Sequence, residues 1–388
     1  MSENTQVTDI AIVGGGMVGL SVARALTQRG RHVTVIEGAQ IGERSAANVA
    51  AGMLAPAAEV DLTDPLLTTL AVASHHEYGA WVADLQRDSG VDVGYEEQGT
   101  LIVAMHQDHL ARLEALYAVQ VERGLPTARI TTAEARQYEP FLSPNIIGAL
   151  RTPDGQVNPR LLLRALPIAL ERAGATLFPG TRVLDVSRTG DRYTITVERD
   201  GATSTVQAQQ VLIAAGAWSK QIVATIEGVP ALPLPMRPVR GQILRLRGER
   251  LIQHVVRSPD VYLVPRADGE LVVGATMEEM GFETKPTAGG VRHLLTEAWS
   301  TLPGTAELEV AELGVGFRPA LRDHNPAIGN VDGRGLFVAS GHFRNGVELA
   351  PVTGRIVANL MCGSLDATDA AMIAPFAPDR FGIAEPAR

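Results

Sequence analysis

The first forty residues alternate between short apolar runs and one longer segment with helical spacing. Residues 9–13 form an apolar run, residues 14–19 are rich in glycine, and residues 32–36 form a second apolar run. Short apolar runs of this length are typical of buried strands in a parallel sheet. Between them, apolar side chains recur on one helical face, at Val18, Val22, Ala25 and Leu26. The pattern predicts a strand–helix–strand unit in which Gly30 ends the helix.

A glycine motif of the form G-x-G-x-x-G lies directly between the first predicted strand and the helix. Gly14 permits a tight turn, Gly16 lets a pyrophosphate approach the backbone, and Gly19 lets helix and strand pack closely. Glu37 ends the second strand, where a carboxylate accepts hydrogen bonds from a ribose and repels the 2′-phosphate of NADP. The motif predicts a dinucleotide on the helix N-terminus and leaves NAD and FAD as alternatives. The predicted residues are Gly14, Gly15, Gly16, Met17, Val18, Gly19 and Glu37.

Further strands of the same sheet are predicted in the middle of the chain and near its C-terminus. The runs 210–216 and 334–341 are apolar and end in glycine. Residues 192–197 and 205–208 alternate as antiparallel strands do. The turn 342–346 leads into a helix with an apolar face, whose N-terminus is a second place suited to an anion. The dinucleotide-binding domain is therefore predicted to be discontinuous and to comprise residues 1–85, 150–225 and 325–388.

The remaining segments predict a second domain. β-like runs occupy residues 239–246, 261–266, 270–277 and 307–317, and residues 91–105 are expected to join them. This domain is assigned to residues 86–149 and 226–324. The predicted fold class is α/β, with a Rossmann-like dinucleotide-binding domain and a second α+β substrate domain built on a mostly antiparallel sheet.

Composition and charge exclude several classes of protein. The 388 residues include 34 Lys+Arg and 43 Asp+Glu, a formal net charge of −9, which argues against a nucleic-acid partner. No apolar run approaches the roughly 18 residues of a membrane span, and the polar N-terminus lacks the apolar stretch of a signal peptide. The single cysteine, Cys362, excludes an internal disulfide and a cysteine-based zinc site. These features predict a cytoplasmic protein with no metal site and no membrane partner.

Several motifs beyond the glycine loop resemble those of one family, the FAD-dependent amine oxidases of the D-amino-acid oxidase type. Within that family, the chain is most similar to the glycine oxidases of thiamine biosynthesis. The resemblance runs from about residue 9 to residue 381. The motifs that carry it are residues 50–56, 262–266, 273–277, 317–319, 341–346 and 376–381.

The resemblance implies an oxidase that binds FAD non-covalently. Glycine would be oxidised to an imine that hydrolyses to glyoxylate and ammonia, while dioxygen becomes hydrogen peroxide, and the imine would feed formation of the thiazole of thiamine. The implied partners are a small amine or amino acid and dioxygen, and relatives suggest a homo-oligomer, a tetramer. The residues that would contact FAD are Arg44, Ser45, Ala50, Ala51, Gly52, Val183, Gly216, Gly341, His342, Phe343, Arg344, Asn345, Gly346 and Val347.

The same resemblance implies a substrate site. Arg318 would hold the substrate carboxylate, Tyr262 would hydrogen-bond to it, Arg344 would line both the flavin and the substrate site, and Met277 would narrow the pocket. Chemistry favours this choice, because the planar fork of an arginine binds a carboxylate better than lysine does. Hydride transfer needs a neutral amine but no strong protein base. Other roles stay open: Arg318 on the surface, Tyr262 in the core, and Met277 as a gap-filling core residue.

Three positions depart from the family pattern. Asp260 stands two residues before Tyr262, where related glycine oxidases often carry histidine; Glu348 stands where an apolar residue is common; and no tryptophan lies near Phe317 in the sequence. The preferred substrate therefore stays open among glycine, sarcosine and D-amino acids. A dehydrogenase that passes electrons to a quinone and a flavin-binding module without turnover are the alternative functions. Dioxygen consumption with peroxide production separates the oxidase from the dehydrogenase.

Overall fold

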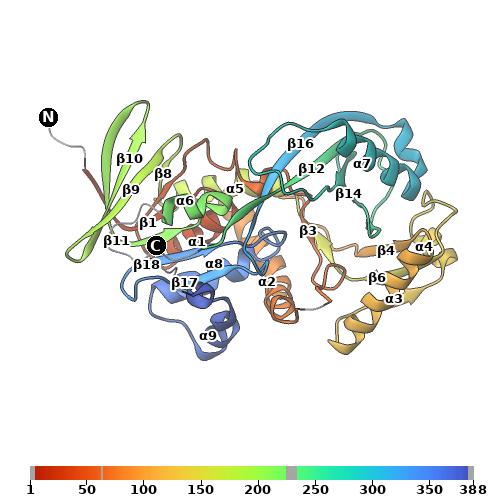
Figure 1. Cartoon of the computed structure of the whole chain (residues 1–388), viewed down its shortest axis with the longest axis horizontal. Coiled ribbons are helices and arrows are strands. Elements are labelled where there is room, and N and C mark those ends of the chain that lie inside the picture. The colour runs from red at the N-terminus through yellow and green to blue at the C-terminus, as the bar shows by residue number, and fades with distance from the viewer. Residues whose placement is uncertain (1–4, 63, 224–233, 383–388) are drawn as a thin grey trace, which may run out of the picture.

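Two eight-stranded sheets lie side by side along the long axis of the molecule (Figure 1). The computed structural model describes residues 5–62, 64–223 and 234–382. Segments from the beginning, middle and end of the chain combine in the first sheet, and the second sheet lies at the opposite end of the molecule from the described N-terminus. The predicted fold class, a Rossmann-like α/β domain with a second domain on a mostly antiparallel sheet, is confirmed.

The first sheet has β1 (Thr5–Val13) near its centre. β1 pairs in parallel with β2 (Val33–Ile36) on one side and with β11 (Ala202–Ile213) on the other. The outer strands are β8 (Thr176–Phe178), β9 (Arg182–Thr189), β10 (Arg192–Arg199), β17 (Ala327–Asn330) and β18 (Leu336–Ser340). Both faces of the central strands are buried, which explains why their sequences read as continuous apolar runs.

Helices cover one face of this sheet. Ile10 and Ile12 point toward them, whereas Ala11 and Val13 point toward the opposite face, as the alternation of a strand requires. The helices that pack against one another on the first face are α1 (Met17–Thr27), α2 (Leu66–Ser89), α5 (Pro159–Arg172) and α8 (Ala350–Met361). Shorter helices are α6 (Ser219–Val223) and α9 (Ala367–Ile373). The strand–helix–strand unit predicted for the first forty residues is thus β1–α1–β2.

The second sheet is antiparallel except where β13 (Val255–Arg257) pairs in parallel with β4 (Thr100–Ala104). Its other strands are β5 (Ala128–Ile130), β6 (Gly148–Thr152), β12 (Arg237–Arg247), β14 (Tyr262–Pro265), β15 (Glu270–Gly274) and β16 (Glu309–Ala320). The flanking helices are α3 (Gln107–Glu122), α4 (Thr132–Tyr138) and α7 (Ala288–Thr301). A small two-stranded sheet, β3 (Met53–Leu54) with β7 (Gly155–Gln156), lies between the two large ones (Figure 1).

Some boundaries differ from the sequence-based expectations. The runs 205–208 and 210–213 belong to one long strand, β11, because β1 and β10 pair with it along most of its length. The boundary predicted between residues 149 and 150 falls inside β6, which pairs with β4 and β5 in the second sheet. We therefore propose that the domain boundary follows β6.

Among the helices of the described residues, no helix has the length and apolar character of a membrane-spanning segment.

Candidate active site

A cavity of about 650 Å³ extends from the glycine loop of the first sheet to the second sheet. At one end it is lined by Gly14 and Glu37, and at the other by Tyr262, Arg318 and Arg344. Its size is that of a pocket for a small molecule or cofactor. The cavity thus brings together two groups of residues that the sequence predicted separately, one for a dinucleotide and one for a substrate.

The glycine loop is shaped by close backbone contacts. Gly14 has a φ of +119°, and a Cβ on it would lie 2.4 Å from the carbonyl oxygen of Ala214. A Cβ on Gly19 would lie 2.1 Å from the carbonyl oxygen of Gly14, so α1 packs directly on the loop. A Cβ on Gly16 would lie 3.3 Å from Ser45 Oγ, and Gly16 lines the cavity. Only glycine fits at positions 14 and 19, and a side chain at position 16 would enter the cavity.

These residues fit the diphosphate of FAD. Helix α1 begins at Met17 without a side-chain cap from the described residues, so its N-terminal N–H groups are available to an anion. Glu37 lines the cavity and accepts hydrogen bonds from the backbone N–H groups of Gly15 (2.7 Å) and Ala39 (3.0 Å). These bonds hold the carboxylate at the end of β2, where the sequence placed a ribose contact.

Most residues predicted to contact FAD line the cavity. They are Gly14, Gly16, Met17, Val18, Glu37, Arg44, Ser45, Ala50, Ala51, Gly52, Val183, Gly216, Gly341, His342, Phe343, Arg344, Gly346 and Val347. His342 is buried, its Nε2 lies 3.1 Å from Thr353 Oγ1, and burial lowers its pKa to about 4. The imidazole of His342 is therefore neutral at physiological pH.

Four predicted residues do not line the cavity. Within the glycine motif, the backbone N–H of Gly15 donates to Glu37, and Gly19 packs against the carbonyl oxygen of Gly14. Asn345 is turned away from the cavity and donates to Glu348. Met277 is 64% exposed and does not line the cavity, so the structure does not place it where the prediction that it narrows the pocket requires. It lies between Thr276 and Glu278, whose backbone N–H groups donate to the carbonyl oxygens of Gln242 and Arg240 on β12.

At the second sheet, two glycines make room for the predicted substrate residues. Arg318 on β16 lies over Gly241 on β12, where a Cβ would be 2.5 Å from Arg318 Nη1. Tyr262 on β14 lies over Gly274, where a Cβ would be 2.3 Å from the tyrosine hydroxyl. Arg318 donates to the carbonyl oxygen of Thr276 at 3.1 Å, and its positive charge acts on the nearby Tyr262 hydroxyl. Burial raises the pKa of Tyr262 and lowers that of Arg318.

Glu59 is a cavity residue that the sequence analysis did not find. Its Oε1 is bonded to Arg344 and lies 3.2 Å from Arg257 Nε. Burial alone would raise the pKa of Glu59, but the positive charges of Arg344, Arg257 and Arg318 bring it below its ordinary value. Glu59 is therefore ionised at neutral pH. The available signal was a lone acid directly after the small-residue segment 50–58.

The cations of this region differ in their counter-ions. Arg344 and Arg257 share the carboxylate of Glu59. For Arg318, no carboxylate of the described residues lies within the 4.0 Å of a salt bridge. A partly buried cation without a counter-ion is costly, and an anionic ligand offsets that cost. The site is therefore suited to one carboxylate, bound at Arg318.

Glu348 is buried behind the small-residue segment and does not line the cavity. Its Oε1 accepts from the backbone N–H of Ala55 at 2.8 Å, and its Oε2 accepts from the side-chain amide of Asn345 at 2.9 Å. Burial raises the pKa of Glu348 to about 8, and the carboxylates of Glu59 and Asp154 add to the increase. Glu348, which departs from the family pattern, thus holds the small-residue segment in place through its hydrogen bond with Ala55.

We expect Glu348 to make the protein less stable as the pH rises. The pKa of about 8 in the folded state lies above the ordinary value of 4.5, so between these values the folded protein holds a proton that the unfolded chain has lost. The free energy of unfolding therefore decreases across that interval. The Tm of Glu348→Gln should fall less than that of the wild type between about pH 6 and pH 9, as measured by scanning calorimetry. Glu122→Gln, at an exposed position, is the control; identical slopes for all three proteins would contradict the assignment.

Comparison with known proteins supports FAD as the cofactor of this cavity. Residues 9–360 match the DAO family of FAD-dependent oxidoreductases. The chain is 34% identical to the glycine oxidase of Geobacillus kaustophilus, over 96% of this chain and 97% of that protein. A crystal structure of glycine oxidase from that organism has a TM-score of 0.89, covering 97% of this chain and 99% of the other.

A second group of relatives is longer. The chain is 32% identical to the bifunctional protein ThiO/ThiG of Synechocystis sp., over 96% of this chain but 54% of that protein. It spans about half the length of these bifunctional relatives. The family match covers most of the chain, and it agrees with the glycine loop and with the cavity beside that loop. The chain belongs to the DAO family of FAD-dependent oxidoreductases.

Proposed function

We propose that this protein is an FAD-dependent oxidase that converts glycine, dioxygen and water to glyoxylate, ammonia and hydrogen peroxide. The observation that carries the proposal is the guanidinium of Arg318, a partly buried side chain that lines the FAD cavity without a carboxylate partner among the described residues. An α-amino acid supplies the missing carboxylate. The relatives named glycine oxidase support glycine as the substrate.

The protein's part in this reaction is to bind and orient the substrate. FAD, when bound, supplies the acceptor for the hydride that leaves the substrate Cα. Arg318 and Tyr262 hold the carboxylate from two strands of the second sheet and so fix the direction of the Cα–H bond. Such orientation lowers a barrier by up to roughly 7–11 kcal/mol in the most favourable intramolecular cases. Glu59 is engaged by two arginines, so we assign it charge balance and not proton abstraction.

Steady-state kinetics test this proposal and separate it from its alternatives. Oxygen uptake and peroxide release are measured with glycine, sarcosine and D-alanine at several concentrations. The proposal predicts equal rates of oxygen uptake and peroxide release, with the highest kcat/KM for glycine. A higher kcat/KM for sarcosine or D-alanine would identify that amine as the preferred substrate in place of glycine. Turnover only with a quinone as electron acceptor would identify the protein as a dehydrogenase. Absence of turnover with every substrate and acceptor would leave the flavin-binding module.

Gly241 provides a test of the position of Arg318. Gly241→Ala places a methyl group against the guanidinium, which is the far end of a flexible side chain, so the guanidinium moves and the fold persists. A misplacement of about 1 Å can cost a hundredfold in rate, and we expect kcat/KM for glycine to fall by about ten- to a hundredfold. The FAD content should remain that of the wild type. Gly289→Ala on α7, where a Cβ meets nothing within 4 Å, is the control and should keep full activity. Unchanged kinetics for Gly241→Ala would place the substrate elsewhere.

The similarity to the bifunctional ThiO/ThiG proteins supports a metabolic role. We propose that the glycine-derived imine feeds formation of the thiazole of thiamine. Deletion of the gene should create a growth requirement for the thiazole moiety, which an intact copy removes and an Arg318→Met copy does not. We also propose a homo-oligomer in the cytoplasm; size-exclusion chromatography with light scattering measures the oligomeric state.

A further inference from the structure

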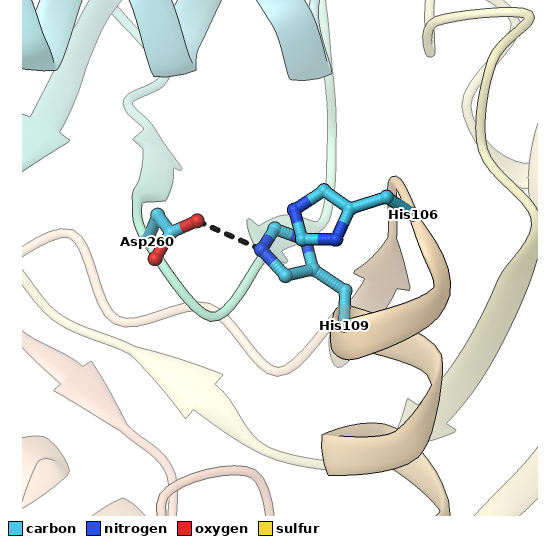
Figure 2. A group of neighbouring side chains, drawn as sticks. All are labelled: His106, His109 and Asp260. Carbon is cyan, nitrogen blue, oxygen red and sulfur yellow. Dashed lines mark hydrogen bonds and ion pairs between the residues drawn. The ribbon is translucent and has the colours of Figure 1, made fainter.

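Three side chains that the proposed function leaves unused meet beyond the ends of β4 and β13 in the second sheet (Figure 2). His106 and His109 belong to the first turn of α3, where His106 is the N-cap residue. Asp260 lies in the loop between β13 and β14. The sequence analysis predicted no metal site, and it did so without any means of bringing residues 106 and 260 together. It is the pairing of β4 with β13 that places the two segments side by side.

The geometry of this cluster is that of a chelating set. One ligand atom from each residue lies within 4.8 Å of the other two. His109 Nε2 lies 2.7 Å from Asp260 Oδ2, and the two imidazole rings are 3.6 Å apart between centroids. His109 is 3% exposed, whereas His106 is exposed and its side chain makes no hydrogen bond or ion pair with the described residues. One ligand is therefore fixed, and a second is free to turn toward an ion.

We propose that His106, His109 and Asp260 form a binding site for a divalent transition-metal ion of the zinc type. Two imidazoles and one carboxylate suit Zn²⁺ better than Mg²⁺ or Ca²⁺, which take mainly oxygen ligands. Three protein ligands leave one position of a tetrahedral ion for water. The ion would take the place of the hydrogen bond between His109 Nε2 and Asp260 Oδ2 and coordinate all three side chains at once, with the neutral imidazole of His109 carrying its proton on Nδ1.

The position of the site defines its effect on the rest of the protein. None of the three residues lines the FAD cavity. Asp260 lies between Arg257, which pairs with Glu59, and Tyr262, which contacts Arg318. An ion at Asp260 ties this loop to the beginning of α3 and stabilises the folded state, because it binds the native arrangement and not the unfolded chain. Its binding does not depend on glycine being the substrate.

Isothermal titration calorimetry with ZnCl₂ tests the site in the tag-free, FAD-loaded protein after removal of metals by a chelator. We expect one Zn²⁺ per chain and a rise in Tm on addition of Zn²⁺. His106→Ala changes an exposed side chain, and Asp260→Asn keeps a hydrogen-bond acceptor for His109, so both variants should fold. Each should bind Zn²⁺ at least about tenfold more weakly and lose the rise in Tm.

The matched control is His293→Ala, which removes an exposed histidine of α7 outside the cluster and should bind as the wild type does. Two results would overturn the proposal. One is no Zn²⁺ binding by the wild type under these conditions. The other is binding by His106→Ala or Asp260→Asn with the affinity and stoichiometry of the wild type, which would place the ion elsewhere on the surface.

Discussion

Replacing Arg318 with methionine is expected to raise the KM for glycine by at least about 30-fold while FAD remains bound. Methionine retains much of the apolar length of the side chain but removes the cation that holds the substrate carboxylate. Loss of one partner of a buried charge pair costs about 2–5 kcal/mol, which corresponds to roughly 30-fold to several thousandfold in affinity. The measurement is steady-state kinetics, together with the visible spectrum of the bound flavin.

Two comparisons make the result for Arg318 specific. The KM of Arg318→Lys for glycine should lie between that of the wild type and that of Arg318→Met. Lysine keeps the charge but lacks the planar guanidinium that binds both oxygens of a carboxylate. An amine without a carboxylate should react no more slowly with Arg318→Met than with the wild type, since it makes no use of the guanidinium. A methionine variant with the wild-type KM for glycine would remove Arg318 from the substrate site.

Gly16→Val is expected to weaken FAD binding by at least about a hundredfold without unfolding the protein. Gly16 has only Ser45 within 4 Å of its missing Cβ and otherwise faces the cavity, so a valine side chain occupies the space beside the N-terminus of α1. The diphosphate then loses close approach to the backbone N–H groups, and charge-assisted hydrogen bonds of about 1.5–3 kcal/mol each are lost.

Titration of the apoprotein with FAD, followed by flavin fluorescence, measures this loss for Gly16→Val. The control is Gly289→Val on α7, which adds the same side chain in open space far from the glycine loop in sequence. Circular dichroism verifies that both variants are folded. Wild-type affinity in Gly16→Val would show that the diphosphate does not approach this residue.

The dinucleotide end of the site could be predicted from sequence because its parts are neighbours in the chain. Strand, glycines, helix and Glu37 all lie within residues 5–37, so their spacing alone encodes β1–α1–β2 and the contact of Gly19 with Gly14. Arg318 and Tyr262 were found through motifs of the family, and the structure brings them together over Gly241 and Gly274.

Other features depend on contacts between distant segments, which periodicity does not report. Glu59 becomes a cavity residue only because Arg257 and Arg344, about 200 and 285 positions later, are folded against it. Met277 belongs to a motif of the family, yet its side chain is exposed although its neighbours Thr276 and Glu278 pair with β12. The boundary predicted at residue 149 falls inside β6, because the second sheet includes β6 through its pairing with β4.

The measurement that tests the central claim most directly is the visible spectrum of the purified FAD-loaded protein before and after addition of excess glycine without oxygen. The account predicts that the yellow absorbance bleaches with glycine, because the amino acid bound at Arg318 reduces the flavin, and that it returns when air is admitted. An unchanged oxidised spectrum in the presence of saturating glycine would contradict it.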